Sequence, residues 1–384
     1  MLGPAPAQIA AAAPTPVSSA QFPPNLQFES ITAGPGGLLM SGTATIAGNS
    51  GVDCLSAEVN PLALSLSHLI EPRCDDPRIS GEPFMAVSQP LAGGLADDLR
   101  IARLSPLGTG NIELGPVIAT YEEASDTHLE SALGGGTLWL YVAAPRASPN
   151  HSEAIEVSEA SGQVLQKALL PWVLTRPVVT ADDEGLYIAP SIESGFSAAG
   201  AKSEVTIFRV GPTSRSAQPF YVAGTGGLGG GEFTNWMVGD GSALWAEVCR
   251  HLSTTNACHV LRFDRLVPRP ALTSAETAQT DDWAVGNGVS GIFSSLFPSS
   301  TVTGAEPTST TIVKIDPSNG AQTTVASVTL PAYWGELSYD ANPDAALYDG
   351  ALYLLGPSGQ TSLPVGGPET VPTTLYRVPV GAPA

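Results

Sequence analysis

A glycine-rich stretch, AGTGGLGGGEFTNW, contains Gly224-x-Gly226-x-x-Gly229, the spacing of a dinucleotide-binding fingerprint. Such glycines leave a strand and open a helix, because the amides at the helix N-terminus bind the pyrophosphate. Residues 217–224 are β-branched and aromatic and predict the strand. Residues 232–248 lack apolar residues at helical spacing and contain the hairpin signal GDG at 239–241. We therefore predict a strand-to-strand loop that binds no nucleotide.

A second oxygen-rich spacing lies in DANPDAALYDG, and it matches the start of a calcium loop. The candidate ligands are Asp340, Asn342 and Asp344. Ala345 and Ala351 stand where an EF-hand requires Gly and Glu, so an EF-hand is excluded. A polar turn ahead of an Asp349-Gly350 hairpin is the favoured interpretation, and Ca²⁺ is the only cofactor for which the chain offers a candidate.

Signatures of catalysis are sparse. The chain has no G-x-S-x-G nucleophile elbow and no H-E-x-x-H zinc helix. Among five histidines, His128 follows Glu122, Glu123 and Asp126, and this makes it the best general acid–base candidate. A solvated loop histidine is the simpler interpretation, so we assign no catalytic residue.

The four cysteines predict disulfides. Cys249 and Cys258 bracket RHLSTTNA between two strand-like runs, and Cys54 and Cys74 would then pair with each other. Three pairings exist, and the sequence alone does not choose among them. The spacing is too wide for a zinc site. Disulfides indicate an extracytoplasmic compartment, such as a secreted, periplasmic or cell-surface location.

The elements that position these residues must be short strands. The 384 residues include 41 Gly and 34 Pro, which oppose long helices, yet 43% of the chain is hydrophobic and can bury a large core. The formal charge of −20 repels phosphate backbones and excludes nucleic acid as a partner. The scarcity of lysine and the Ala/Gly/Pro/Arg bias are typical of a high-GC bacterial coding sequence.

The N-terminal residues 1–17 are rich in Pro and Ala and predict a linker ahead of a single domain at 18–384. They lack the basic and long apolar regions of an intact signal peptide. We therefore expect either a removed export signal or an upstream membrane tether. No stretch is long and apolar enough for this chain to insert into a membrane.

A repeat of about 50 residues runs through the chain, and each copy contains a short apolar strand that follows a turn residue. These strands are GGLLMSG (36–42), EPFMAVS (82–88), GTLWLYV (136–142), EGLYIAP (184–190), SALWAEV (242–248), SGIFSSL (290–296) and GALYLLG (350–356). An alternating strand such as TIVKIDPSNG (311–320) follows each of them. Each copy therefore predicts a four-stranded unit that cannot bury both faces alone.

This pattern resembles the seven-bladed β-propeller class over residues 20–384, without a signature that names a family. The resemblance implies an all-β ring of four-stranded antiparallel blades, with six or eight blades as alternatives. The last unit lacks its fourth strand, and SSAQFPPNLQ (18–27) is expected to supply it and close the ring.

In a propeller of this kind, the connections between blades and those between the second and third strands share one face, where ligands usually bind. Tryptophans that supply flat contact area are expected at this face, namely Trp172, Trp236, Trp283 and Trp334. The acidic ligand-binding candidates there are Glu232, Asp281, Asp282 and Glu336. Burial of each indole between blades, and acids that serve only solubility, are the simpler alternatives.

Together these features favour a non-catalytic propeller that recognises a glycan, a peptide or a partner protein on its loop-bearing face. The alternative is a secreted hydrolase or lyase that acts on a polysaccharide or lactone at the mouth of the central channel. Convergent carboxylates, or a histidine beside them, would distinguish the enzyme from the binding module.

Overall fold

A computed structural model describes residues 17–34, 37–45, 52–70, 76–81, 84–90, 97–104, 112–121, 129–143, 150–174, 176–191, 206–222, 232–251, 256–280, 283–296, 308–330, 344–356, 359–363, 367–371 and 373–380. All regular secondary structure in these ranges is β-strand, as the Gly and Pro content predicts. The described residues include no helix with the length and apolar character needed to cross a lipid bilayer.

Six four-stranded antiparallel sheets are each built from consecutive strands. The first two contain β2 (Leu26–Gly34), β3 (Gly37–Thr45), β4 (Val52–Val59) and β5 (Leu66–Ile70), then β6 (Asp76–Gly81), β7 (Phe84–Pro90), β8 (Asp97–Leu104) and β9 (Ile112–Tyr121). The next two contain β10 (Leu129–Gly134), β11 (Thr137–Ala143), β12 (Ser152–Ser158) and β13 (Val164–Leu170), then β14 (Val178–Asp182), β15 (Gly185–Ala189), β16 (Thr206–Val210) and β17 (Gln218–Val222). The last two contain β18 (Glu232–Gly239), β19 (Ala243–His251), β20 (Asn256–Asp264) and β21 (Pro270–Thr273), then β22 (Val285–Asn287), β23 (Gly291–Ser295), β24 (Thr308–Ile315) and β25 (Gln322–Leu330).

A further four-stranded sheet joins the two ends of the chain in the order β1-β30-β27-β26. Its strands are β1 (Ser18–Gln21), β26 (Asp344–Tyr348), β27 (Ala351–Leu355) and β30 (Thr374–Pro379). Ser18 pairs with Arg377 and Gln21 with Thr374, so the predicted N-terminal closing strand is confirmed. Six blades are therefore each built from one continuous stretch of the chain. The remaining sheet combines strands from both ends of the chain, because the last repeat lacks its own fourth strand.

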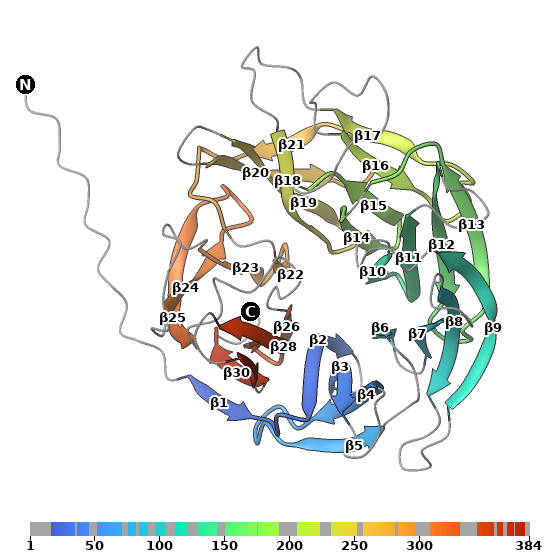
Figure 1. The fold of residues 1–384 in the computed structure, drawn as a ribbon. Helices are drawn as coiled ribbons and strands as arrows, with labels where there is room; N and C mark the ends of the chain where they lie inside the picture. Colours follow the sequence, from blue (N-terminus) through green and yellow to red (C-terminus); the bar gives the residue numbers. More distant parts are fainter. Residues whose placement is uncertain are drawn as a thin grey trace, which may run out of the picture.

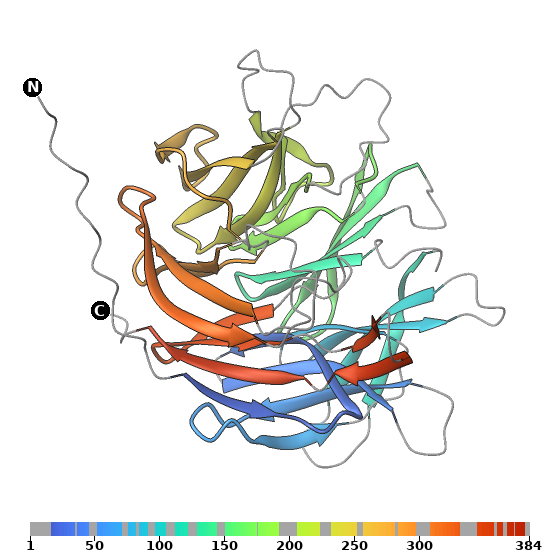
Figure 2. The same ribbon diagram turned by 60° about the vertical axis from the view of Figure 1, so that its left-hand side comes forward.

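The sheets form a closed ring (Figures 1 and 2). Each innermost strand contacts that of the next sheet in the sequence β2, β6, β10, β14, β18, β22, β26 and back to β2. The approach is close, since a Cβ added at Gly134 in β10 would lie 2.3 Å from the Ala181 carbonyl of β14. The predicted all-β propeller of four-stranded antiparallel blades is thus confirmed.

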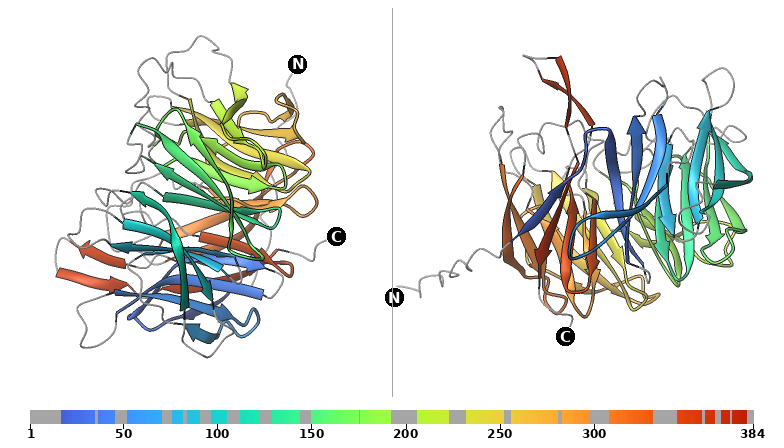
Figure 3. Two further views of the ribbon diagram at one scale, coloured as in Figure 1. Left: turned by 90° about the vertical axis from the view of Figure 1, so that its right-hand side faces the viewer. Right: turned by 90° about the horizontal axis from the view of Figure 1, so that it is seen from below.

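Tight turns connect the first and second strands of the blades where that connection is described. At the predicted Asp349-Gly350 hairpin both residues have positive φ, 45° and 69°, which is the geometry of a type I′ turn. The strand ends that these turns join, and the ends where a third strand passes to a fourth, lie on one face of the ring, which we call the turn face. The strand ends that the remaining connections join lie on the opposite, loop face. A two-stranded hairpin of β28 (Gly359–Leu363) and β29 (Gly367–Val371) extends from the ring within one of those connections (Figure 3).

The core is divided into layers between neighbouring blades. One layer joins Leu99 and Ile101 of β8 to Leu138 and Leu140 of β11, and apolar clusters of the same kind among the described residues fill five of the other gaps between neighbouring blades. Trp139 and Trp245 are 0% and 1% exposed, as their mid-strand positions predict. The blades from β10–β13 to the closing sheet of β26, β27 and β30 are therefore held by apolar burial on both faces. This packing fixes how neighbouring strands present their polar side chains.

Candidate binding pocket on the loop face

A pocket of about 220 Å³ opens on the loop face, where β17 borders the blade of β18–β21. Its lining residues are Tyr221, Glu232, Val248, Cys249, Arg250, Ala257, His259, Leu261 and Thr273. Tyr221 and Glu232 flank the connection that contains the glycine-rich stretch. β17 precedes this connection and the strand β18 follows it, so the glycines join two strands as predicted (Figure 1). Residues 223–231 themselves lie outside the described part of the chain.

The disulfide between Cys249 and Cys258 sets the register of the pocket wall. The two cysteines are direct register partners in β19 and β20, and both are fully buried. This register places Val248 opposite His259 and Arg250 opposite Ala257. The bond confirms one predicted disulfide. Cys54 lies in β4, but its side chain and the whole of Cys74 lie outside the described structure, so that pairing remains a prediction.

His259 is oriented by a main-chain carbonyl. Its Nδ1 lies 3.1 Å from the carbonyl oxygen of Ser274. Because a carbonyl oxygen only accepts, Nδ1 carries the proton, and Nε2 of the neutral ring is left as an acceptor. The Ser274 segment is itself held, since Ser274 Oγ accepts a 2.9 Å hydrogen bond from the Val260 amide. The imidazole can therefore accept a proton or a hydrogen bond from a ligand.

An acidic and a basic residue on neighbouring strands line this pocket. Glu232 and Arg250 are register partners in β18 and β19. Arg250 Nε is buried and has no hydrogen-bond acceptor among the described residues. Burial, and secondarily the charge of Glu232, raises the pKa of Tyr221, which keeps its phenol protonated. The pocket thus offers a carboxylate, a guanidinium, an imidazole and a phenol beside the apolar side chains of Val248 and Leu261.

The opposite side of β19 contains a buried carboxyl network. Glu247 is 0% exposed, and its Oε2 accepts hydrogen bonds from Asn235 Nδ2 at 2.7 Å and from Thr280 Oγ1 at 2.8 Å. Trp236 Nε1 donates to the same Thr280 hydroxyl at 2.7 Å. Glu247 Oε1 has no partner among the described residues. Burial raises the pKa of Glu247 to about 7, so this group changes charge near neutral pH.

The predicted tryptophan platform is not exposed at the described positions. Trp172, Trp236 and Trp283 are 9%, 1% and 8% exposed. Trp172 lies 4.6 Å from the ring of Phe208 in the next blade, and Trp283 packs in the layer that contains Phe293. These indoles fill the spaces between blades, where their large apolar area is removed from water. At these three positions the indoles therefore offer little exposed area to a ligand.

Several other candidates lie outside the described residues. These are His128, Trp334, Asp281, Asp282, Glu336, Asp340 and Asn342. Asp344 begins β26 and pairs with Leu355, but its side chain is not described. Glu232, whose side chain is described, lines the loop-face pocket.

Sequence reasoning missed Tyr221, Arg250 and His259 as partners of Glu232. A signal was present, because the Cys249–Cys258 staple sets the register and strand alternation then puts Arg250 and His259 on one side. Glu247 was missed too, although a glutamate inside the apolar run ALWAEVC is a signal of a buried carboxyl.

No protein-family model and no curated protein sequence matches this chain. Among solved structures, the β-propeller domain of the trilobed protease from Pyrococcus furiosus matches with a TM-score of 0.53 and 10% identity, over 90% of this chain and 92% of that one. The chain has a β-propeller fold. The matched domain is described as having an open velcro topology, whereas β1 and β30 pair here.

Two peptidases also match the propeller. A prolyl endopeptidase has a TM-score of 0.51 and 12% identity over 88% of this chain, and an acylaminoacyl peptidase from Pyrococcus horikoshii has 0.50 and 9% over 90%. The match covers 45% and 50% of those longer chains. At these identities the likeness concerns the fold alone, so the function must be argued from the site.

Proposed function

We propose that this protein is an extracytoplasmic, non-catalytic binding propeller that recognises a glycan through the loop-face pocket. The observation that supports this proposal is the convergence of Tyr221, Glu232, Arg250 and His259 on one concave site. The disulfide that holds the pocket wall is compatible with an oxidising compartment. A peptide or a partner protein is the alternative ligand for this face.

A sugar fits this mixture of groups better than a purely apolar or a singly charged ligand. Sugar hydroxyls both donate and accept, and the pocket offers an acceptor in Glu232, a donor in Arg250 and an acceptor in His259 Nε2. Val248 and Leu261 supply apolar area for the carbon face of the ring. A volume of about 220 Å³ suits one sugar residue of a longer chain that continues into solvent.

The test is a glycan- and peptide-array screen of the oxidised protein with and without Ca²⁺, followed by titration of the best hit. Arg250→Gln and His259→Gln are each expected to weaken that hit about tenfold, since each removes a hydrogen bond to a polar ligand. Arg269→Gln is the matched control, because Arg269 is exposed and does not line the pocket. A hit whose affinity is unchanged by both pocket substitutions would show that the ligand binds elsewhere on the protein. Hits confined to peptides would show that the ligand is a peptide and not a glycan.

A lyase is the enzymatic alternative that the same pocket favours over a hydrolase. Elimination requires a base and a cation beside an acidic sugar, which His259 and Arg250 can supply. A glycoside hydrolase usually needs two carboxyl groups, and Glu232 is the only one among the described lining residues. Incubation with acidic polysaccharides decides between binding and catalysis. Formation of an unsaturated, ultraviolet-absorbing uronate would establish lyase activity. An unchanged polymer would favour the non-catalytic binding module.

A further inference from the structure

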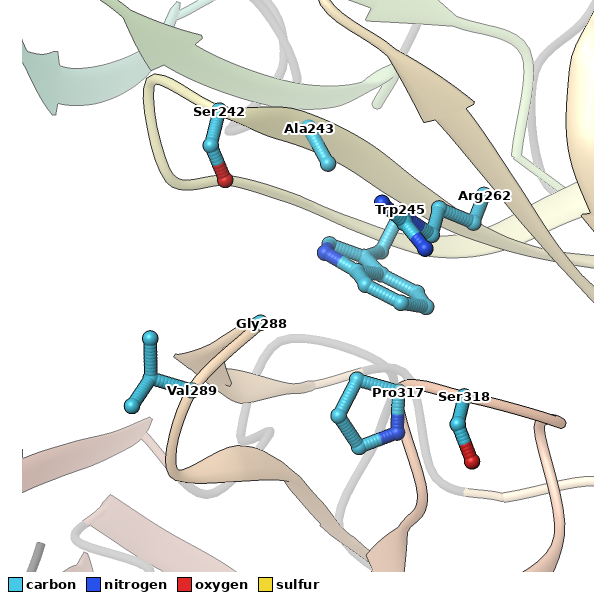
Figure 4. Close-up of a pocket in the computed structure, with 8 residues that line it drawn as sticks. All are labelled: Ser242, Ala243, Trp245, Arg262, Gly288, Val289, Pro317 and Ser318. Carbon is cyan, nitrogen blue, oxygen red and sulfur yellow. The ribbon is translucent and has the colours of Figure 1, made fainter. Parts of the chain in front are cut away.

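The unpaired polar groups of a second pocket are out of reach of a ligand. This pocket, of about 290 Å³, lies on the turn face between the blade of β18–β21 and the blade of β22–β25 (Figure 4). Trp245 Nε1 and Arg262 Nε are buried beneath it and have no hydrogen-bond partner among the described residues. Because only 1% of Trp245 is exposed, its ring is covered as well. These two groups therefore give no basis for recognition of a ligand.

The loop-face pocket differs, because its polar groups are both unpaired and reachable. Among the described residues, the carboxylate of Glu232 and the terminal nitrogens of Arg250 form no hydrogen bond and no ion pair, either with each other or with a third group. These atoms remain accessible, whereas Arg250 Nε is buried. Both residues are half-buried and line the pocket. A ligand in the pocket can therefore contact both groups directly.

Glu232 and Arg250 present an acceptor and a donor side by side. They are register partners in β18 and β19, and directly opposite residues have Cβ atoms about 4.5–5.5 Å apart on the same side of a sheet. A carboxylate only accepts hydrogen bonds and a guanidinium only donates them. Since the two side chains do not pair with each other, they complement a ligand group whose donor and acceptor lie on separate atoms.

An apolar side chain adjoins this pair. Val248 precedes Arg250 by two residues in β19, so strand alternation puts the two side chains on the same side of the sheet. Val248 is half-buried and lines the same pocket. A ligand group that reaches Arg250 therefore meets the methyl groups of a valine beside it. The pocket combines an acceptor, a donor and an apolar contact within a few ångströms.

A charged ligand group fits this arrangement poorly. An ammonium that approaches Glu232 meets the like charge of Arg250 on the next strand, and a carboxylate that approaches Arg250 meets Glu232. The formal charge of −20 also repels an anion at longer range. A hydroxyl group avoids this repulsion, but it has its donor and acceptor on one oxygen and brings no methyl group. A neutral secondary amide with a methyl substituent satisfies all three contacts.

We propose that the loop-face pocket recognises the acetamido group of an N-acetylated hexosamine. The amide N–H donates to Glu232, the carbonyl oxygen accepts from a terminal nitrogen of Arg250, and the methyl group contacts Val248. His259 Nε2 and the phenol of Tyr221 remain for the hydroxyls of the same sugar, which a simple peptide amide lacks. This inference rests on the proposed glycan-binding function and narrows it to one class of sugar.

The test compares methyl glycosides that differ in one substituent, titrated into the oxidised protein and followed by saturation-transfer NMR. N-acetylglucosamine carries the acetamido group, glucosamine an ammonium and glucose a hydroxyl, and the galactose series repeats the comparison on the epimeric ring. We expect at least one acetamido sugar to bind at least about tenfold more tightly than its hydroxyl and ammonium counterparts. Its acetyl methyl protons should receive the strongest saturation. N-acetylalanine methylamide is the probe for a peptide amide and should bind more weakly.

Three variants locate the contacts. Glu232→Ala removes the acceptor and Arg250→Gln shortens the donor, and each is expected to lower the affinity for the acetamido sugar about tenfold. Val248→Thr keeps the β-branched shape but replaces a methyl group by a hydroxyl, so it should lower both the affinity and the saturation of the acetyl methyl protons. Arg269→Gln, on the same blade but outside the pocket, should change neither. Thermal denaturation verifies that each variant is folded.

Equal affinity for the acetamido and hydroxyl sugars would overturn the inference and still leave a glycan-binding pocket. Tighter binding of the ammonium sugars would show that the negative charge of the protein selects the ligand, and tighter binding of N-acetylalanine methylamide would assign the pocket to a peptide. Unchanged affinity in both Glu232→Ala and Arg250→Gln, or no binding of either acetamido sugar at millimolar concentration, overturns it as well. Failure of the proposed function is seen separately, as the absence of any glycan hit on the array.

Discussion

Cys249 and Cys258 stand directly opposite each other in β19 and β20, and their bond separates two polar environments on the two sides of one sheet. Alternation along β19 turns Arg250 toward the loop-face pocket and Glu247 toward the buried network with Thr280. One covalent register therefore determines both arrangements, because a slip of one residue would exchange the two sides.

Removal of this disulfide should reduce both stability and binding. The double substitution Cys249→Ser, Cys258→Ser frees a loop with a sequence separation of 9. Loop-closure entropy predicts a loss of about 2.5 kcal/mol in the free energy of unfolding, measured by urea denaturation. Ligand binding at the loop-face pocket should weaken as well. Unchanged affinity in a folded, disulfide-free variant would show that the strand pairing alone maintains the pocket.

The buried carboxyl of Glu247 should make stability depend on pH. Burial raises its pKa to about 7 in the folded protein, against 4.5 for an ordinary glutamate. The protonated group is favoured on folding, so its contribution is fully present below about pH 4.5 and is lost as pH rises through about 7. Between those limits the free energy of unfolding should fall by about 3 kcal/mol from this group alone.

Glu247→Gln isolates that contribution. The variant should be more stable than the parent at pH 8, and the difference should shrink toward pH 5, as measured by urea denaturation at both pH values. Glu276→Gln is the matched control, because Glu276 is exposed and outside the network. A stability difference for Glu247→Gln that stays constant with pH would show that the carboxyl does not titrate in this range.

The tryptophan at the centre of the network should support stability and not recognition. Trp236→Phe removes the hydrogen bond from Nε1 to Thr280 Oγ1 and part of a fully packed side chain. A loss of about 1–3 kcal/mol in the free energy of unfolding is expected. Affinity for a loop-face ligand should remain unchanged, and a selective loss of affinity at constant stability would return Trp236 to the binding site.

The pairing of β1 with β30 should be required for closure of the ring. Deletion of residues 1–21 leaves the edge of β30 unpaired, which should lower the melting temperature and promote self-association through that edge. Deletion of residues 1–16, which precede β1, is the matched control and should change neither property. Both are measured by thermal denaturation and by size-exclusion chromatography. Equal behaviour of the two truncations would show that the last blade is stable with three strands.

Local chemistry in the sequence determined the strand class, the repeat and the closure of the ring. Gly and Pro exclude long helices, the turn before each apolar run marks each blade, and the missing fourth strand of the last repeat indicated the role of residues 18–21. The sequence also indicated the Cys249–Cys258 pairing, because the two cysteines flank one short loop, but it left three pairings open and the structure shows this one. Except for the closure of the ring, which pairs the two ends of the chain, these features depend on residues close together in the sequence.

Only the tertiary structure decided which polar groups converge and which aromatic groups are buried. Trp236 and Trp283 lie where connections enter blades, a place that sequence cannot distinguish from an exposed edge, and packing against a neighbouring blade buries them. Tyr221 and His259 come together because adjacent sheets are held face to face by their apolar layers. The physical reason is that contacts between blades depend on the twist and spacing of whole sheets, which no local pattern of residues encodes.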